Sequence, residues 1–261
     1  MTIVVEYRIP MPFTMEEYAV GQLYMIAQAS MAESKPGEGV SFVKNEPIDP
    51  NDSQKGWYTR KIFHVGNSPQ IPKFIRAIIK NAVNVVENSW NSWPHYRTEY
   101  HSPLFGSNFK YTIESYHVAD KAESDANDLP IQIKDKYKKK KKVVVLDIAT
   151  SDPAAMADCN PLTHSCEKSG MPPLTEDWLE TQPADRVMTA YKVVTVHCNI
   201  FGVGHRIEQF VQRLTAELFV QYHRKIFVWH DSWFDKTMED IHELESLAQQ
   251  KLAVSQSMEV V

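Results

Sequence analysis

The sequence predicts an α+β fold in which helices pack on one face of a mostly antiparallel sheet. Short segments with alternating polar and apolar residues fill much of the first 200 residues, as in β-strands. Apolar residues recur at intervals of three and four from Ile207 to Trp233, as on one face of a helix. Many consecutive strands framed by an early and a late helix are typical of this class. With no internal repeat and no clear boundary, we expect one domain over residues 1–261.

Composition excludes several classes of protein. The 261 residues carry 28 Lys+Arg against 33 Asp+Glu, a net charge of −5 that argues against a general nucleic-acid binder. A hydrophobic content of 43% excludes a disordered chain. Three cysteines are too few for a disulfide framework, and no segment is apolar enough to span a membrane. We therefore expect a soluble, cytoplasmic protein whose membrane contact is peripheral and transient.

The first half alternates between strands and two helices. A strand over residues 3–9 should stop at Pro10 and Pro12. Thr14 and Glu17 have the spacing of a capping box, which predicts a helix to about residue 34. Further elements are expected as strands at 39–44 and 57–65, a helix at about 72–82, and a strand meander at 83–90, 95–101 and 108–117.

The second half ends in helices. Residues 118–142 form a lysine-rich exposed segment, and a strand resumes at 143–148. Residues 151–185 are rich in Pro, Ser, Asp and Thr, which predicts an irregular excursion before a long strand at 187–198. Helices should occupy 206–255, the second of them capped by Thr237 and Asp240.

Signatures of catalysis and of metal binding are missing. The chain has no nucleophile elbow, no phosphate-binding loop and no complete dinucleotide fingerprint. Cys159, His164 and Cys166 could offer three metal ligands, but their spacing matches no known zinc module and a fourth ligand is not apparent. The scattered histidines are interpreted as half-exposed structural residues. We expect no catalytic residue and no metal site.

Two lysines lie on strand faces that should otherwise be apolar. Lys61 shares a face with Thr59 and Phe63, and either points to water or faces an anion in a cavity. Lys192 is the one charge on the apolar face of its strand. A buried lysine without a partner is costly, so Lys192 needs a nearby carboxylate or a bound anion. Glu245, at the edge of an apolar helical stripe, is by itself most simply solvated.

Two other segments leave alternatives open. Ile200 and Phe201 stand beside glycines in a turn, where they either tuck under the fold or form a wedge that enters a membrane interface. The cluster Lys134–Lys142 contains seven lysines. It is either a solvated charge run or a segment attracted to anionic lipid, and it could be mistaken for a nuclear-localisation or nucleic-acid patch.

Motifs in conserved order along nearly the whole chain resemble those of the phosphatidylinositol transfer proteins. They include Glu6-Tyr7-Arg8, Gly21-Gln22-Leu23-Tyr24, Tyr58-Thr59-Arg60-Lys61-Ile62, Ser89-Trp90-Asn91-Ser92-Trp93-Pro94, Ala190-Tyr191-Lys192 and Thr237-Met238-x-Asp240-Ile241…Glu245. The resemblance implies a START-like fold, in which a concave antiparallel sheet is closed by two long helices around a cavity for one phospholipid.

The resemblance also implies a role for individual residues. Thr59, Lys61, Asn91 and Glu245 would hold the inositol ring, and Gln22, Thr98, Ser115 and Lys192 would surround the phosphate. Tyr96 and Tyr222 would line the cavity, and Ile200 and Phe201 would dock on membranes. This chain departs from the family at three of these places. Ile200-Phe201 replaces a pair of tryptophans, Tyr96 replaces a cysteine of the animal short forms, and Ser115 replaces a threonine.

The function implied is lipid exchange rather than catalysis. A monomer would bind phosphatidylinositol and a second lipid, such as phosphatidylcholine or phosphatidic acid, and move them between membranes without a cofactor. It could thereby supply inositol-lipid kinases. One alternative is a module that presents its lipid to a kinase without bulk transfer. Another is a lipid hydrolase that uses a serine and one of the ten histidines.

Overall fold

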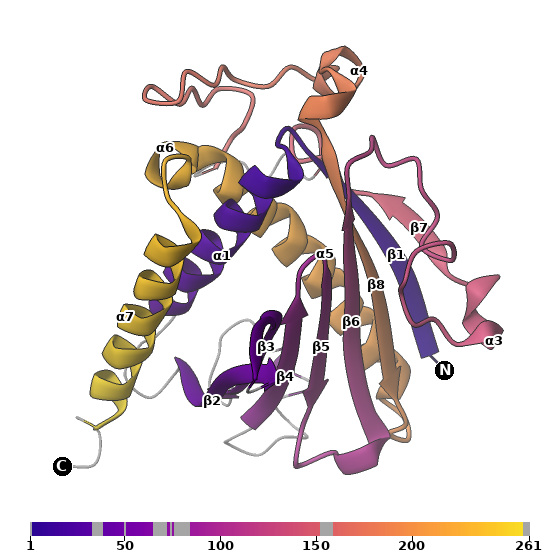
Figure 1. The fold of residues 1–261 in the computed structure, drawn as a ribbon. Coiled ribbons are helices and arrows are strands. Elements are labelled where there is room, and N and C mark those ends of the chain that lie inside the picture. Colours follow the sequence, from indigo (N-terminus) through magenta and orange to yellow (C-terminus); the bar gives the residue numbers. More distant parts are fainter. Residues whose placement is uncertain are drawn as a thin grey trace.

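A computed structural model describes residues 2–32, 39–49, 51–64, 72–73, 75, 84–151 and 159–257. Its centre is an open, eight-stranded, mostly antiparallel sheet in the order β2-β3-β4-β5-β6-β8-β1-β7 (Figure 1). Only β7 runs parallel to its neighbour. The strands are β1 (Thr2–Met11), β2 (Gly39–Asp49), β3 (Asp52–His64), β4 (Asn84–Ser92), β5 (His95–His101), β6 (Phe109–Val118), β7 (Lys142–Val145) and β8 (Met188–Cys198).

Three long helices pack beside this sheet. Helix α5 (Gly204–Val228) packs across β8 and β1, and α7 (Met238–Ser257) packs against β2. Helix α1 (Met15–Ala32) contacts both α5 and α7 (Figure 1). The short elements are η1 (Gly106–Asn108), α3 (Asp135–Lys138), α4 (Trp178–Thr181), η3 (Ala184–Arg186) and α6 (His230–Trp233). The arrangement confirms the α+β, START-like class. Among the described residues no helix is long and apolar enough to cross a bilayer.

Both predicted capping boxes are formed. The Thr14 N–H donates to Glu17 Oε2 at 2.8 Å, and the Glu17 N–H donates back to Thr14 Oγ1 at 3.2 Å. At the start of α7, the Thr237 N–H donates to Asp240 Oδ2 at 2.7 Å and the Asp240 N–H to Thr237 Oγ1 at 3.2 Å. These pairs satisfy backbone donors that a helix leaves free at its first turn, which explains where α1 and α7 begin.

Two early strands run through prolines and end later than predicted. β1 continues through Pro10 to Met11, and β7 pairs only with Val5–Arg8 of this strand. At Pro10 that side of β1 is therefore an edge, where the missing N–H costs nothing. β2 likewise runs through Pro47, since it is the edge strand of the sheet.

The other boundaries differ modestly from the prediction. The single apolar stripe predicted over 207–233 is interrupted at Trp229, which separates α5 from α6. β7 ends at Val145 rather than at residue 148. Residues 159–185 are largely irregular, as expected, apart from the one-turn helix α4. The predicted helix at 72–82 lies mostly outside the described residues.

The main core lies between the helices and the β1–β8 region of the sheet. Trp233, 1% exposed, donates its Nε1–H to the Ile226 carbonyl at 2.9 Å. Its ring lies so close to α1 that a Cβ on Gly21 would stand 2.7 Å from it, which requires glycine there. The largest fully buried side chains around it include Tyr7, Ile9, Met11, Phe13, Tyr18, Met188, Ile226 and Phe227.

One member of the lysine cluster is buried, contrary to a uniformly solvated run. The Lys141 side chain is 4% exposed, and its Nζ lies 2.5 Å from Glu6 Oε2 and 2.9 Å from Asp125 Oδ1. Burial disfavours its charge, but the bonds to Glu6 and Asp125 outweigh burial and hold the Lys141 pKa above its ordinary value. Glu6 is fully buried and also accepts from Arg8 Nε at 2.7 Å. This Glu6–Lys141 pair fixes the cluster to β1.

Removing this lysine should destabilise the protein. Lys141→Met leaves the Glu6 carboxylate buried with less compensation, which costs about 3 kcal/mol in unfolding free energy. Lys140→Met, at the exposed neighbouring position, should change it by less than about 0.5 kcal/mol. Urea denaturation of both variants measures the difference, and equal unfolding free energies would contradict the assigned role of Lys141.

Candidate functional site

Strand register places the candidate residues on one face of the sheet. Directly opposed residues share a face, and so do residues two apart along a strand. One row across the sheet reads Trp57, Asn91, Tyr96, Ser115, Lys192, Tyr7. The next two rows begin Thr59, Ser89, Thr98, Ile113 and Lys61, Glu87, Tyr100, Tyr111. All seven predicted site residues on the strands therefore lie on the same face within three adjacent rows.

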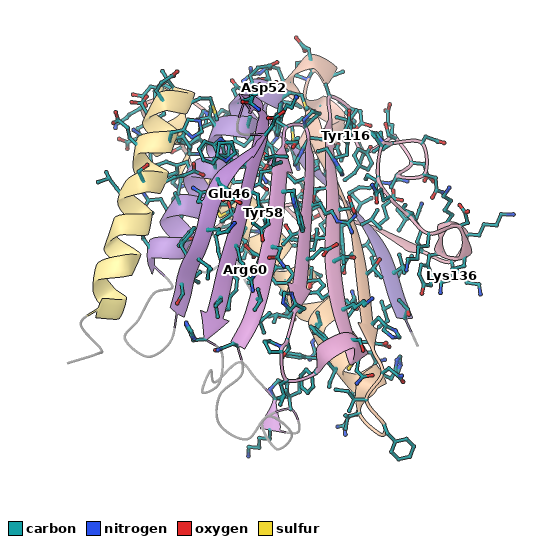
Figure 2. All side chains as sticks on the ribbon, turned by 60° about the horizontal axis from the view of Figure 1, so that its bottom comes forward. Glu46, Asp52, Tyr58, Arg60, Tyr116 and Lys136 are labelled. Carbon is teal, nitrogen blue, oxygen red and sulfur yellow. The ribbon has the colours of Figure 1, made fainter. Side chains whose placement is uncertain are left out.

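Helix α5 identifies this as the inner face. The Tyr111 and Thr215 hydroxyls lie 2.8 Å apart, and Gln212 donates Nε2–H to the Tyr7 hydroxyl at 2.7 Å. The rings of Tyr7 and Phe219 meet edge to face at 5.5 Å. Tyr58 and Arg60, which alternate with Thr59, belong to the opposite face (Figure 2). The candidate polar groups thus lie between the sheet and the helices.

Lys61, Tyr96 and Glu245 come together from three elements. Burial raises the Glu245 pKa, while His242 and the charge of Lys61 oppose that rise. Burial, followed by the charge of Glu245, raises the Tyr96 pKa. The rings of Trp57 and His242, 6.2 Å apart, place α7 over β3. The structure therefore brings Glu245 to the sheet residues predicted to work with it.

The sheet supplies partners that sequence reasoning missed. Lys61 Nζ lies 3.8 Å from Glu87 Oε1, and the side chains are 12% and 9% exposed. Thr59 donates its hydroxyl to Asn45 Oδ1 at 3.0 Å. Both pairs are directly opposed across neighbouring strands, so a correct hairpin register would have found them. Lys61 thus has a carboxylate partner and does not by itself require a bound anion.

Lys192 is different, because it is buried without a counter-charge. It is 7% exposed and forms no ion pair among the described residues. Its Nζ lies 5.4 Å from the centre of the Phe219 ring. Burial alone lowers its pKa to about 8. Gln22 of α1 is 6% exposed, and its Oε1 has no hydrogen-bond partner among the described residues. Both residues belong to the predicted phosphate set.

Of the other two members of the predicted phosphate set, Ser115 is buried and Thr98 is half-buried. Ser115 is 4% exposed and lies opposite Lys192 in the ladder. The Thr98 and Ser89 hydroxyls are 3.0 Å apart. Tyr222 on α5 is half-buried and close enough to contribute, after burial and Glu87, to the raised pKa of Tyr100.

Two buried histidines accompany Lys192, and the sequence did not single them out. His117, expected to be half-exposed, is 1% exposed and stacks on Trp93 at 4.8 Å. His223 hydrogen-bonds the Tyr18 hydroxyl through Nε2 at 2.9 Å. Burial and then the Lys192 charge lower the pKa of His117 well below its ordinary value and that of His223 to about 3. Both imidazoles are therefore neutral beside Lys192 at physiological pH.

Ile200 and Phe201 have separate positions. Phe201 is fully exposed, at 104% of its reference area. Ile200 is half-buried and packs against the main core. The first interpretation of this loop therefore holds for Ile200, which tucks under the fold, whereas Phe201 projects from it and its entry into a membrane interface stays a prediction.

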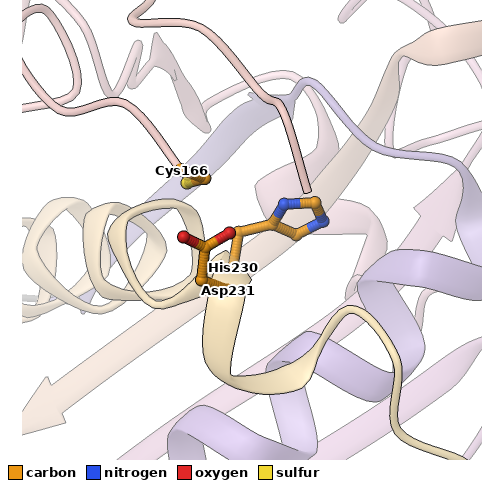
Figure 3. A group of neighbouring side chains, drawn as sticks. All are labelled: Cys166, His230 and Asp231. Carbon is orange, nitrogen blue, oxygen red and sulfur yellow. The ribbon is translucent and has the colours of Figure 1, made fainter. Parts of the chain in front are cut away.

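A second cluster joins the irregular excursion to α6. Possible ligand atoms of Cys166, His230 and Asp231 all lie within 4.8 Å of one another (Figure 3). Asp231 accepts hydrogen bonds from the Lys168 and Ser169 N–H groups at 3.1 and 3.0 Å. His230 Nδ1 lies 2.7 Å from Ser169 Oγ. Within the described residues no group of three such ligands includes Cys159 or His164, and Cys166 and Cys198 form no disulfide.

This cluster is not arranged as a catalytic relay. In a serine hydrolase the carboxylate orients the histidine, which then accepts the serine proton. Here Ser169 Oγ donates to Asp231 Oδ1 at 3.0 Å, so His230 Nδ1–H donates to the serine instead of accepting from it. Burial and the Asp231 charge raise the Cys166 pKa, which keeps the thiol protonated. These hydrogen bonds attach the irregular segment that contains Ser169 to α6.

Comparison with known proteins gives one consistent result. A family model described as "Phosphatidylinositol transfer protein" matches residues 2–250. The chain is 36% identical over 245 residues to "Phosphatidylinositol transfer protein 1" of Dictyostelium discoideum, covering 92% of this chain and 90% of that protein. It is 34% identical over 260 residues to "Phosphatidylinositol transfer protein beta isoform" of Homo sapiens, covering 97% and 94%. It also matches "Protein retinal degeneration B" of Drosophila melanogaster at 36% over 269 residues, which cover 96% of this chain and 21% of that protein.

We expect the buried charge of Lys192 to lower the unfolding free energy of the ligand-free protein. Because its pKa is about 8 in the fold and 10.5 ordinarily, Lys192→Met should raise the unfolding free energy at neutral pH by about 2–3 kcal/mol. In the wild-type protein the unfolded chain binds more protons between these values, so stability should rise from about pH 8 toward 10. Above about pH 10 it should fall, since buried tyrosines such as Tyr18 and Tyr111 have raised pKa values.

Urea denaturation across this pH range measures the effect, with exposed Lys110→Met as the matched control. The rise between pH 8 and 10 should disappear in Lys192→Met and persist in the control. An unchanged rise in Lys192→Met would show that another group causes it.

Proposed function

Because the chain belongs to the phosphatidylinositol transfer protein family, we propose that it binds one phospholipid between sheet and helices and exchanges it between membranes. The observation that carries the proposal is Lys192, a buried cation without a carboxylate partner among the described residues. A lipid phosphate would supply the missing charge, and the hydroxyls of Ser115 and Thr98 would add donors. The Gln22 side-chain amide would complete this set by donating through Nε2, since its Oε1, which has no hydrogen-bond partner among the described residues, can only accept.

The headgroup would lie in the rows next to Lys192. An inositol ring carries hydroxyls that both donate and accept, and each must be satisfied when buried. Glu245, the Asn91 carbonyl and the Thr59 hydroxyl oxygen, whose proton goes to Asn45, would accept from the ring, while Lys61 and the Asn91 amide would donate to it. Support comes from the convergence of Lys61, Tyr96 and Glu245 and from the shared sheet face.

Enclosing the acyl chains explains why a whole domain serves this task. A diacyl phospholipid has roughly 30 methylenes, and exposing them to water would cost about 25 kcal/mol at ~0.8 kcal/mol each. Exchange therefore requires docking, opening, swapping of lipid and release, with no bond made or broken. In this proposal the protein acts as a monomer and uses no cofactor other than the bound lipid. The second lipid would be phosphatidylcholine or phosphatidic acid, with Tyr96 and Tyr222 beside it.

Delivery of phosphatidylinositol would also supply inositol-lipid kinases. Presentation of the bound lipid to a kinase without bulk transfer is the second candidate. The exposed Phe201 favours transfer, since a carrier must contact the membrane itself.

Glu245→Gln should reduce loading of phosphatidylinositol by about tenfold and leave loading of phosphatidylcholine unchanged, because it removes a charged acceptor for ring hydroxyls. The structure favours this change over Lys61→Ala, which would leave Glu87 buried without its partner. Mass spectrometry of lipids bound after incubation with mixed vesicles gives the readout. Exposed Glu243→Gln on the same helix is the control. Equal loss of both lipids would mean that Glu245 does not recognise the ring.

Phe201→Ala should slow transfer of phosphatidylinositol between vesicles several-fold, because it removes the projecting apolar side chain, while loading in detergent stays intact. Phe234→Ala is the control, since Phe234 is 40% exposed on the connection that follows α6. A fluorescent-lipid transfer assay compares the two. Transfer at the wild-type rate in Phe201→Ala would exclude this loop as the docking element.

A further inference from the structure

The lysine cluster presents six exposed cations and one anchor. Lys141 is held by Glu6 and Asp125, whereas the other six lysine residues are exposed. Of these six, only Lys138 forms an ion pair among the described residues, with Asp135 at 2.9 Å. The uncompensated charge is therefore local and displayed outward, on a chain whose net charge is −5. The exposed members are Lys134, Lys136, Lys138, Lys139, Lys140 and Lys142.

A chain of contacts places these lysines near the loop that carries Phe201. A hydrogen bond to Thr2 lowers the pKa of Tyr137, which lies in the cluster. The Thr2 hydroxyl lies 3.0 Å from His197 Nδ1, and His197 is the penultimate residue of β8. The Phe201 loop follows β8 directly. Figure 1 shows α3 beside the N-terminal end of β1, and Figure 2 shows Lys136 on α3 at the margin of the molecule.

The same end of the sheet presents apolar side chains and few acids. The β5–β6 connection reaches the Phe201 loop, where the Asn199 N–H donates to the Asn108 carbonyl at 2.7 Å. Leu104 in this connection is 55% exposed, and Phe201 in the adjoining loop is fully exposed. Residues 101–110 and 197–207 contain no Asp or Glu. Nothing in these two segments would repel an anionic surface.

We propose that the six exposed lysines and the tip formed by Leu104 and Phe201 are one docking surface for anionic lipid membranes. The inference rests on the proposed function and gives the lysine cluster a role in it. Lysines near an anionic bilayer are attracted within about a Debye length of 8 Å, while apolar side chains insert at the interface. The apolar tip distinguishes this surface from a nucleic-acid site, whose phosphates would meet no complementary group at Leu104 or Phe201.

The test removes charge without touching the anchor. Lys136→Gln, Lys139→Gln and Lys140→Gln are combined, and the matched control combines Lys44→Gln, Lys55→Gln and Lys168→Gln, which are exposed elsewhere. Vesicle co-sedimentation compares phosphatidylcholine with mixed phosphatidylcholine–phosphatidylserine. We expect the cluster variant to lose about tenfold in affinity for the anionic vesicles only, and the control to lose little. High salt should remove the difference between the two variants.

Two further measurements decide between outcomes. The cluster variant and the wild type should load lipid equally well. If neither of them loads lipid, that result counts against the proposed function and not against the docking surface. Thermal denaturation should show that all variants are folded. Equal affinity of the cluster variant and the control for anionic vesicles would overturn the proposal. So would a loss of affinity for duplex DNA in the cluster variant without a loss for vesicles.

Discussion

The burial of Lys192 without a counter-charge from the described part of the chain is the constraint around which the inner face is organised. Lys192 lies between Ser115 and Tyr7 in its cross-strand row, and its ammonium faces the Phe219 ring. His117 and His223, both within its field, are held neutral, so the region carries one positive charge rather than three. A protein could neutralise such a lysine with a carboxylate, as Glu87 does for Lys61. Because no carboxylate among the described residues pairs with Lys192, an anionic group of a bound ligand can neutralise its charge.

Antiparallel register is what makes this arrangement possible. One row across the sheet contains residues from five strands that are far apart in the sequence, namely Tyr7, Asn91, Tyr96, Ser115 and Lys192. A slip of one residue in any strand would turn its polar group to the outer face. Helix α7 then brings Glu245 to the inner face near Lys61. Polar groups on the inner face therefore depend on the same pairings that build the core.

Much of this could be predicted from the sequence, because the signals were local. The capping boxes at Thr14 and Thr237, the strand meander and the isolated charge of Lys192 are readable within a few residues, and the family motifs pointed to strand residues that share the inner face. What could not be predicted depends on pairing at a distance. The Lys61–Glu87 and Thr59–Asn45 contacts need the hairpin register, and the burial of His117 needs the stacking of Trp93 on it. The separation of Ile200 from Phe201 needs the packing of the loop on the core.

The anchoring of the lysine cluster through Lys141 has an evolutionary consequence. Residues 138–142 are five consecutive lysines, and only the fourth meets Glu6. If replication removes one lysine codon from such a run, the residue that immediately precedes β7 is still a lysine, which can pair with Glu6. A homopolymeric run thus protects the buried ion pair against changes in loop length, while the number of exposed lysines is free to drift. The low complexity of the segment is compatible with one position in it being strictly required.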